Sequence, residues 1–254
     1  MKINSIVLDL DGTILHGDKT ISDYTRLVLK KCKEKGIRIV VATARSEKAA
    51  EKYTKAICPD TIISNGGSLV KSKENTIFEC KLSAKTADAI INELTRQTGF
   101  ISISAETEKG YYATWKKPDS EDYSHAVHYD FSIPLSQDVY KITAELSSSK
   151  GLSQIEAKYS ECKMIPFSDG MWYRFAHKSA TKMNAINKMA EFYDIDRENI
   201  VAFGDDYNDI EMICKCGIGV AMKNGIDEVK EIADYICESN DNDGVAKWIE
   251  RFLL

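Results

Sequence analysis

The chain has 254 residues, with 34 basic and 39 acidic side chains and a net charge of −5. This length is sufficient for one large α/β domain or for a core domain with an insert. A mildly acidic chain has no bulk positive field for nucleic acid or an anionic membrane, so we expect neither as a partner.

The cysteines and the amino terminus favour a cytoplasmic location. The closest cysteines, Cys214 and Cys216, lack partners at zinc-binding spacing, and the sequence has no C-x-x-C pair, so we expect reduced thiols. The chain begins directly with an apolar stretch at 3–10 that contains Asp9, which is unlike a signal peptide. No apolar stretch approaches the ~20 residues that a membrane helix needs.

The first third of the chain alternates short apolar runs with amphipathic stretches. The predicted elements are a strand at 6–8, a helix at 22–35, a strand at 37–42, a helix between Ser46 and Pro59, and a strand at 61–64. Ser22 and Ser46 can cap the two helices, because a serine oxygen accepts hydrogen bonds from the first unpaired amides. Gly36 can end the first helix.

The last third repeats this alternation. The predicted elements are a helix at 180–193, a strand at 200–203, a helix at 210–214, a strand at 218–222, a helix at 226–233, a strand at 234–237, and a final helix that Asp243 can cap. Alternating strands and helices favour an α/β fold with a doubly wound parallel sheet.

The middle of the chain has a different pattern, with a helix expected at 86–98 and helical character at 148–160. Strand-like pieces occur at 100–104, 110–115, 139–146, 162–167 and 171–177. This pattern is typical of an antiparallel α+β domain. We therefore expect an inserted domain at 84–177 between two core segments, 1–83 and 178–254.

Two acids follow the first predicted strand, in the sequence Asp9-Leu10-Asp11-Gly12-Thr13. Carboxylates two residues apart on an extended chain point the same way, and their repulsion favours a nearby cation such as Mg²⁺. The Gly12 and Thr13 amides could meet an anion. The alternative is a simple turn at a strand end. An EF-hand calcium loop is excluded, because Thr20 stands where the twelfth-position glutamate would be.

Three further polar groups follow later in the chain. Thr43-Ala44-Arg45 ends the second strand, where a hydroxyl and free amides suit an oxyanion, although a plain capping cluster explains them equally well. The sequence 204–209, Gly-Asp-Asp-Tyr-Asn-Asp, can present Asp205 to a metal and Asn208 to a phosphate oxygen. Lys182 could neutralise phosphate charge, although most helical lysines are simply solvated.

In chain order, the Asp9-x-Asp11 segment, Thr43, Lys182 and the sequence at 204–209 resemble the motifs of the haloacid dehalogenase superfamily of phosphotransferases. An insert after Asn65-Gly66-Gly67 is similar to the α/β cap, of type C2B, found in Cof-like hydrolases. The tail segments at 221–225, 233–235 and 243–246 also look Cof-like. The resemblance covers nearly the whole chain and implies a Mg²⁺-dependent phosphatase with a catalytic core and a cap that closes over the substrate.

The resemblance also implies roles for particular residues. Asp9 would be the nucleophile and a metal ligand, and Asp11 would be the general acid/base and give its carbonyl to the metal. Asp205 would complete the protein ligands, with Asp209 in support. The phosphoryl oxygens would be held by the side chains of Thr43, Lys182 and Asn208 and by the amides of Leu10 and Ala44, while Asn65 and Asn224 would lie at the edge of the pocket.

Two positions depart from the usual motifs. Ala44 replaces the glycine of Thr-Gly-Arg, and Met183 replaces the glycine of Lys-Gly, which would place a bulky group beside the phosphate site. Neither change removes a catalytic group. We expect a hydrolase of small phosphorylated metabolites, with sugar phosphates as one class. A phosphomutase on the same scaffold and an inactive metabolite sensor are the alternatives, and the natural substrate and the oligomeric state stay open.

Overall fold

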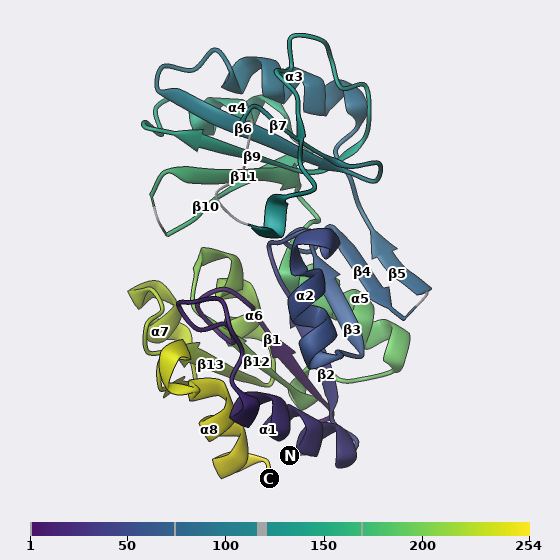
Figure 1. The fold of residues 1–254 in the computed structure, drawn as a ribbon, viewed down its shortest axis with the longest axis vertical. Coiled ribbons are helices and arrows are strands. Elements are labelled where there is room, and N and C mark those ends of the chain that lie inside the picture. The colour runs from purple at the N-terminus through teal and green to yellow at the C-terminus, as the bar shows by residue number, and fades with distance from the viewer. Residues whose placement is uncertain (1, 74, 116–120, 169) are drawn as a thin grey trace. The chain divides into compact units, whose positions relative to one another are not determined.

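The computed structural model describes residues 2–73, 75–115, 121–168 and 170–254 (Figure 1). The chain divides into two compact units. Unit 1 comprises Met1–Phe78 and Thr181–Leu254, and unit 2 comprises Glu79–Ala180. The domain boundaries expected at 84 and 177 both fall inside unit 2.

Unit 1 contains a sheet whose strands follow the order β14-β13-β12-β1-β2-β3-β4-β5. The strands are β1 (Ser5–Leu8), β2 (Arg38–Ala42), β3 (Thr61–Ser64), β4 (Leu69–Ser72), β5 (Asn75–Glu79), β12 (Ile200–Gly204), β13 (Ile218–Met222) and β14 (Tyr235–Cys237). The pairs from β14 to β3 are parallel, as the α/β pattern predicts, whereas β4 runs antiparallel to β3. The sequence pattern does not predict β4 and β5, because β5 at the sheet edge has few buried side chains.

Helices cover both faces of this sheet (Figure 1). On one face pack α1 (Asp23–Glu34), α2 (Glu47–Ile57) and α8 (Gly244–Phe252), and on the other pack α5 (Lys182–Tyr193), α6 (Ile210–Lys215) and α7 (Asp227–Ile232). Strand β1 contributes Ile6 and Leu8 to the first core and Val7 to the second. Burial on both faces is the reason that these strands appear as continuous apolar runs.

Side-chain caps begin three of these helices, as polar residues at the predicted starts suggest. Ser22 Oγ accepts from the Thr25 amide at 2.9 Å, Ser46 Oγ from the Ala49 amide at 3.2 Å, and Thr181 Oγ1 from the Asn184 amide at 3.1 Å. The predicted cap of the final helix is wrong. Asp243 precedes α8 with φ 53°, outside the extended conformation that a cap requires, and makes no capping hydrogen bond.

Unit 2 contains a second sheet, with strand order β10-β11-β9-β6-β7-β8. The strands are β6 (Phe100–Thr107), β7 (Tyr111–Ala113), β8 (Val127–His128), β9 (Val139–Leu146), β10 (Cys162–Pro166) and β11 (Trp172–His177). Helices α3 (Ala84–Leu94) and α4 (Leu152–Lys158) share one apolar core with it. Only the β7–β8 pair is parallel among the pairs described. The insert is therefore α+β and mainly antiparallel, with a shorter first helix than predicted.

Four short 3₁₀ segments complete the described elements: η1 (Glu121–Tyr123), η2 (Arg197–Asn199), η3 (Tyr207–Asp209) and η4 (Asn240–Asn242). The seven cysteines all fall within the described residues, where they are free thiols. Across the part of the chain that the structure describes, the helices are too short or too polar to cross a bilayer.

The register of the unit 1 sheet determines where its polar strand ends meet. Strand β1 lies between β12 and β2, with Leu8 opposite Phe203 on one side and Val41 on the other. The three strands are parallel, so their carboxyl ends reach the same edge. The segments that begin at Asp9, Thr43 and Asp205 follow these ends.

Candidate active site

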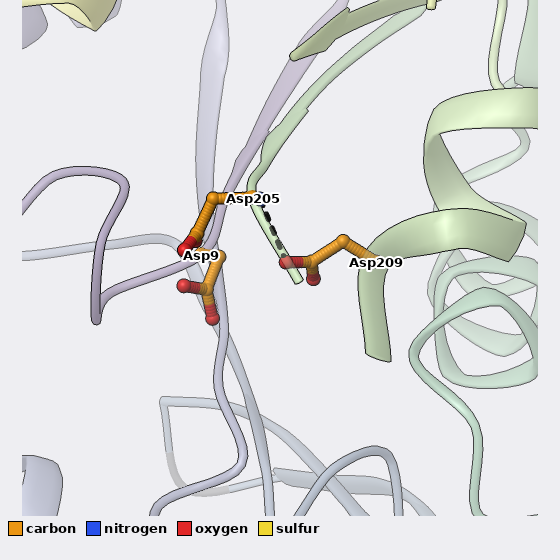
Figure 2. A group of neighbouring side chains, drawn as sticks. All are labelled: Asp9, Asp205 and Asp209. Atoms are coloured by element: carbon orange, nitrogen blue, oxygen red, sulfur yellow. Dashed lines mark hydrogen bonds between the residues drawn. The ribbon is translucent and has the colours of Figure 1, made fainter. Parts of the chain in front are cut away.

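Three acidic side chains converge at this edge of the sheet. Asp9 follows β1, Asp205 follows β12, and Asp209 ends η3, which comes just after β12. Figure 2 shows the three carboxylates directed toward a common region, and one oxygen from each lies within 4.8 Å of the others. The strand order thus brings together acids that are nearly 200 residues apart in the sequence.

Lys182 lies among these acids. Its Nζ contacts Asp9 Oδ1 at 2.5 Å and Asp209 Oδ1 at 2.7 Å, and its side chain is only 2% exposed. Helix α5 begins at Lys182, so the Thr181 cap holds the backbone from which this amine projects. One ammonium group therefore faces three carboxylates, and the cluster carries excess negative charge.

Burial, together with this excess charge, raises the proton affinity of two of the acids. Burial, partly offset by the Lys182 charge, raises the pKa of Asp9 well above its usual value, and the charges of Asp209 and Asp205 raise it further. Burial and the Asp209 charge raise the pKa of Asp205 to about 7. The opposite shift affects the amine: although burial lowers the pKa of Lys182, the charges of Asp209 and Asp9 outweigh it and raise that pKa.

Asp209 is held by backbone amides as well as by Lys182. Its Oδ2 accepts from the amides of Asp205 at 3.0 Å and Asp206 at 3.2 Å. Gly204 makes this possible, because a Cβ there would lie 2.5 Å from Asp209 Cγ. Both oxygens of Asp209 are thus in hydrogen bonds with protein groups, which suits a residue that positions its neighbours.

The turn after Asp9 fits closely against Asp205. Gly12 has φ +77°, and a Cβ at that position would lie 2.2 Å from Asp205 Oδ2. Thr13 Oγ1 donates to Asp205 Oδ1 at 2.7 Å. The sequence drew attention to the Gly12 and Thr13 amides, whereas the Thr13 hydroxyl, which ties the first motif to the last, was missed.

Asp11 lies in a different environment from Asp9. Its carboxylate accepts from Arg45 Nε at 2.6 Å and Arg45 Nη2 at 2.8 Å, and it also contacts Lys19 Nζ at 2.8 Å. Burial alone would raise the pKa of Asp11, but Arg45 and then Lys19 outweigh it and lower that pKa to about 2. The sequence did not single out Arg45 or Lys19, although the Arg of the Thr-x-Arg motif was a signal for the first.

The residues expected to hold phosphate lie around the same strand ends. Thr43 is buried, and its Oγ1 accepts from the Arg45 amide at 3.1 Å. Asn208 Oδ1 is buried and has no hydrogen-bond partner among the described residues. Buried unpaired acceptors are uncommon in folded proteins, so this atom is suited to a ligand or water. The Leu10 carbonyl accepts from the amides of three residues that follow Gly12, which closes the turn.

Ala44 and Met183, which replace glycines of the usual motifs, lie in different surroundings. Ala44 follows Thr43 at the end of β2, and the backbone around it pairs with the Asn65-Gly66-Gly67 turn through the Gly66 amide and the Thr43 carbonyl at 2.9 Å. The crowding expected from Met183 is wrong. The Met183 side chain is 2% exposed and lies in the apolar core on the α5 side of the sheet.

The two asparagines expected at the pocket edge differ in exposure. Asn65 is 2% exposed, and its backbone amide donates to the Arg45 carbonyl at 2.8 Å. Nearby, a Cβ at Gly67 would lie 2.3 Å from the Thr181 carbonyl carbon, so the turn at 65–67 packs against the start of α5. Asn224 is exposed, and its Nδ2 donates to the Gly12 carbonyl at 2.7 Å.

The cluster has the chemistry of a divalent-cation site. Carboxylate oxygens are the ligands that hard cations prefer. Three carboxylates surround one ammonium group, so the ionised cluster has more negative charge than Lys182 neutralises. A divalent cation would remove that excess, so the residues present fit such an ion.

Comparison with known proteins gives consistent results. The family model described as haloacid dehalogenase-like hydrolase matches residues 6–249. The 5-amino-6-(5-phospho-D-ribitylamino)uracil phosphatase YitU of Bacillus subtilis (strain 168) is 26% identical over 262 residues, covering 98% of this chain and 97% of YitU. The phosphatase YcsE, of the same description and organism, is 27% identical over 255 residues, covering 99% and 96%. The solved structure of the HAD subclass IIB sugar phosphatase BT4131 has a TM-score of 0.86 at 22% identity, covering 99% of each chain.

Proposed function

The chain belongs to the haloacid dehalogenase-like hydrolases and is a phosphatase of that family, and we propose that it works through an aspartyl-phosphate on Asp9. Its substrates are small phosphorylated metabolites. Within that class we propose sugar phosphates and related polyol phosphates, because similar proteins are described as a sugar phosphatase and as phosphoribitylaminouracil phosphatases. We propose Mg²⁺ as the cation.

The observation that carries this proposal is the pairing of Asp9 with Lys182 inside the cluster of three acids. A carboxylate that attacks a phosphate monoester must overcome the repulsion between two anions. The Lys182 ammonium, 2.5 Å from Asp9 Oδ1, reduces that repulsion and supplies a donor for a phosphoryl oxygen. When bound, Mg²⁺ would add charge neutralisation and orient the phosphoryl group.

Each residue then has a distinct role in the proposed site. Asp9 and Asp205 would hold the cation through their carboxylates and Asp11 through its carbonyl, while Asp209 keeps Lys182 and the Asp205 backbone in place. Asn208, whose Oδ1 is buried without a partner among the described residues, would donate through its Nδ2 to a phosphoryl oxygen. Thr43 and the amides of Leu10 and Ala44 would hold the remaining phosphoryl oxygens.

Asp11 is proposed as the general acid and base. Its ionised form, which Arg45 and Lys19 favour, is the form that takes a proton from the water that attacks the phospho-enzyme. The first half of the reaction needs the protonated form, which gives a proton to the leaving oxygen. A bound phosphate dianion would raise the pKa of Asp11, because like charges disfavour the ionised carboxylate.

The test is a screen of phosphorylated metabolites for release of inorganic phosphate, with and without Mg²⁺. We expect Mg²⁺-dependent release that disappears in Asp9→Asn and Asp11→Asn, while Asp196→Asn serves as a matched control on an exposed acid outside the site. Transfer of the phosphoryl group to a sugar in place of release would favour the phosphomutase. Binding without turnover in the wild-type protein would favour the metabolite sensor.

A further inference from the structure

The turn at 223–226, which follows β13, contacts both acid-bearing loops of the site. The Asn224 Nδ2 donates to the Gly12 carbonyl at 2.7 Å, in the loop that carries Asp9 and Asp11. Two residues later, the Ile226 amide donates to the Asp205 carbonyl at 2.9 Å. This turn therefore connects the two loops whose acids would share the cation.

The packing around these contacts leaves little freedom for the loops to move independently. A Cβ at Gly225 would lie 2.9 Å from the Asp205 carbonyl oxygen, and a Cβ at Gly12 would lie 2.2 Å from Asp205 Oδ2. Glycine is needed at Gly225 because the Asp205 backbone approaches closely, and at Gly12 because the Asp205 carboxylate approaches closely and φ is positive. A displacement of the turn would consequently shift Asp205 relative to Gly12.

The side chain of Asn224 is held at both ends. Its Oδ1 accepts from the Asn240 amide at 3.0 Å, while Asn240 Nδ2 donates to the Leu15 carbonyl at 2.8 Å. Position 224 therefore requires a side chain with one donor and one acceptor. Asparagine has both, whereas aspartate and leucine, which are similar in size, do not. Both the nitrogen and the oxygen of this side chain are therefore in hydrogen bonds with the backbone.

We propose that Asn224 is a positioning residue that sets the separation between the Asp9 loop and Asp205, and through it the affinity for the divalent cation. This proposal rests on the proposed function, because it assigns Asn224 to the cation site of the same phosphatase. It replaces the expectation that Asn224 lies at the pocket edge to contact the substrate.

The test measures Mg²⁺ binding directly, by calorimetric titration of the metal-free protein with Mg²⁺ alone. Asn224→Leu removes both hydrogen bonds at similar size, and we expect it to weaken Mg²⁺ binding about five- to twentyfold. Asn224→Asp keeps the acceptor for Asn240 and loses the donor to Gly12. We expect it to weaken binding as well, although its added negative charge would by itself strengthen Mg²⁺ binding.

Lys223→Gln is the matched control, because Lys223 is exposed in the same turn, and we expect less than about a twofold change. At saturating Mg²⁺, the substrate KM of both Asn224 variants should stay within about twofold of wild type, since the residue is not assigned to the substrate. Thermal unfolding of the metal-free variants controls for folding.

Two results would overturn the assignment. One is an unchanged Mg²⁺ affinity with a raised KM, which would return Asn224 to the substrate. The other is a Mg²⁺ affinity of Asn224→Leu equal to that of Lys223→Gln, with an unchanged KM, which would leave Asn224 without a role at the cation site. A wild-type protein that binds Mg²⁺ but releases no phosphate would reject the phosphatase proposal, while weaker Mg²⁺ binding in both Asn224 variants would still support the positioning role.

Discussion

Asp9 and Asp11 are two residues apart at the end of one strand, yet their surroundings have opposite effects on them. The Asp9 side chain is 9% exposed and lies in a cluster of acids, where burial raises its pKa well above the usual value. The Asp11 side chain is 40% exposed, and Arg45 and Lys19 lower its pKa to about 2. Two identical side chains thus have opposite pKa shifts in the metal-free protein. The proposed roles need these shifts reversed: a bound cation would favour the ionised form of Asp9, and a bound phosphate would raise the pKa of Asp11.

The comparison also separates two kinds of ion pair. Lys182 is buried with the acids that it pairs, so the loss of Lys182 would leave buried carboxylates without a counter-charge. Lys19 pairs with Asp11 where both side chains are close to half exposed, so solvent screens that pair and its contribution is small. Arg45 lies between these cases, because its side chain is 9% exposed and it binds Asp11 through two nitrogens.

The largest expected effect comes from Asp9→Asn, which keeps the shape of the side chain and removes the nucleophile. We expect phosphate release to fall by at least about a thousandfold. The metal-free protein should be as stable as wild type or more stable, because one of three mutually repelling carboxylates is gone. Steady-state rates and thermal unfolding would check both; a variant with substantial residual activity would contradict the difference drawn between Asp9 and other acids.

Lys182→Met should have the next largest effect. We expect activity to fall by about a hundredfold or more and the metal-free protein to lose about 3 kcal/mol of unfolding free energy, because the buried acids lose their counter-charge. Saturating Mg²⁺ should recover part of that stability. Chemical denaturation with and without Mg²⁺ measures this, and Lys188→Met, at a partly exposed lysine on the same helix, is the control. Equal stability of the two variants would contradict the account.

The raised pKa of Asp205, about 7 in the folded protein against 3.8 for an ordinary Asp, predicts a pH dependence. The folded metal-free protein binds more protons than the unfolded chain between these values, so its stability falls as pH rises through this window. Mg²⁺ needs the ionised form, and its apparent affinity should rise by up to about tenfold per pH unit below pH ~7. Thermal unfolding near pH 5 and pH 8, with and without Mg²⁺, would reveal both trends. Equal stabilisation by Mg²⁺ at the two pH values would contradict the raised pKa of Asp205, and with it the contrast with Asp11.

The smallest effects should come from substitutions of the two basic residues that contact Asp11. Arg45→Lys keeps the charge but loses the two-nitrogen contact, and we expect about a tenfold loss of kcat/KM with the acidic limb of the pH profile moved upward. Lys19→Met should cost about threefold at most, since that pair is exposed. A pH–rate profile for each variant distinguishes a change in Asp11 ionisation from a general loss of structure; identical profiles for wild type and Arg45→Lys would remove Arg45 from this role.

The sequence predicted most of the unit 1 fold, because local signals agree with the tertiary structure there. Ser22 and Ser46 begin helices where their spacing suggests, and fully buried strands appear as apolar runs. Strands β4 and β5 were missed: β4 has only two apolar residues in succession, and the edge strand β5 is largely exposed. Asp243 was predicted as a cap on its residue type, but its Oδ1 accepts from Ser22 Oγ at 2.5 Å and Thr25 Oγ1 at 3.0 Å.

For the site, the sequence could nominate acids at strand ends, because parallel strands end at one edge. It could not show which basic residue meets which acid. The contacts of Arg45 and Lys19 with Asp11, of Thr13 with Asp205, and of Asn224 with Gly12 depend on loop paths and side-chain reach. Met183 is a second example: the sequence predicted that its side chain would crowd the phosphate site, but its face of α5 packs into the apolar core.

The central claim is that Asp9 takes the phosphoryl group. The most direct measurement is acid quench of the enzyme during turnover, followed by borohydride reduction, which converts an aspartyl phosphate to homoserine, and by mass spectrometry of the peptides. The account predicts homoserine at position 9 in the presence of substrate and Mg²⁺, with Asp11, Asp205 and Asp209 unmodified. Sustained phosphate release with no modification at Asp9, or with modification at another acid, would contradict it.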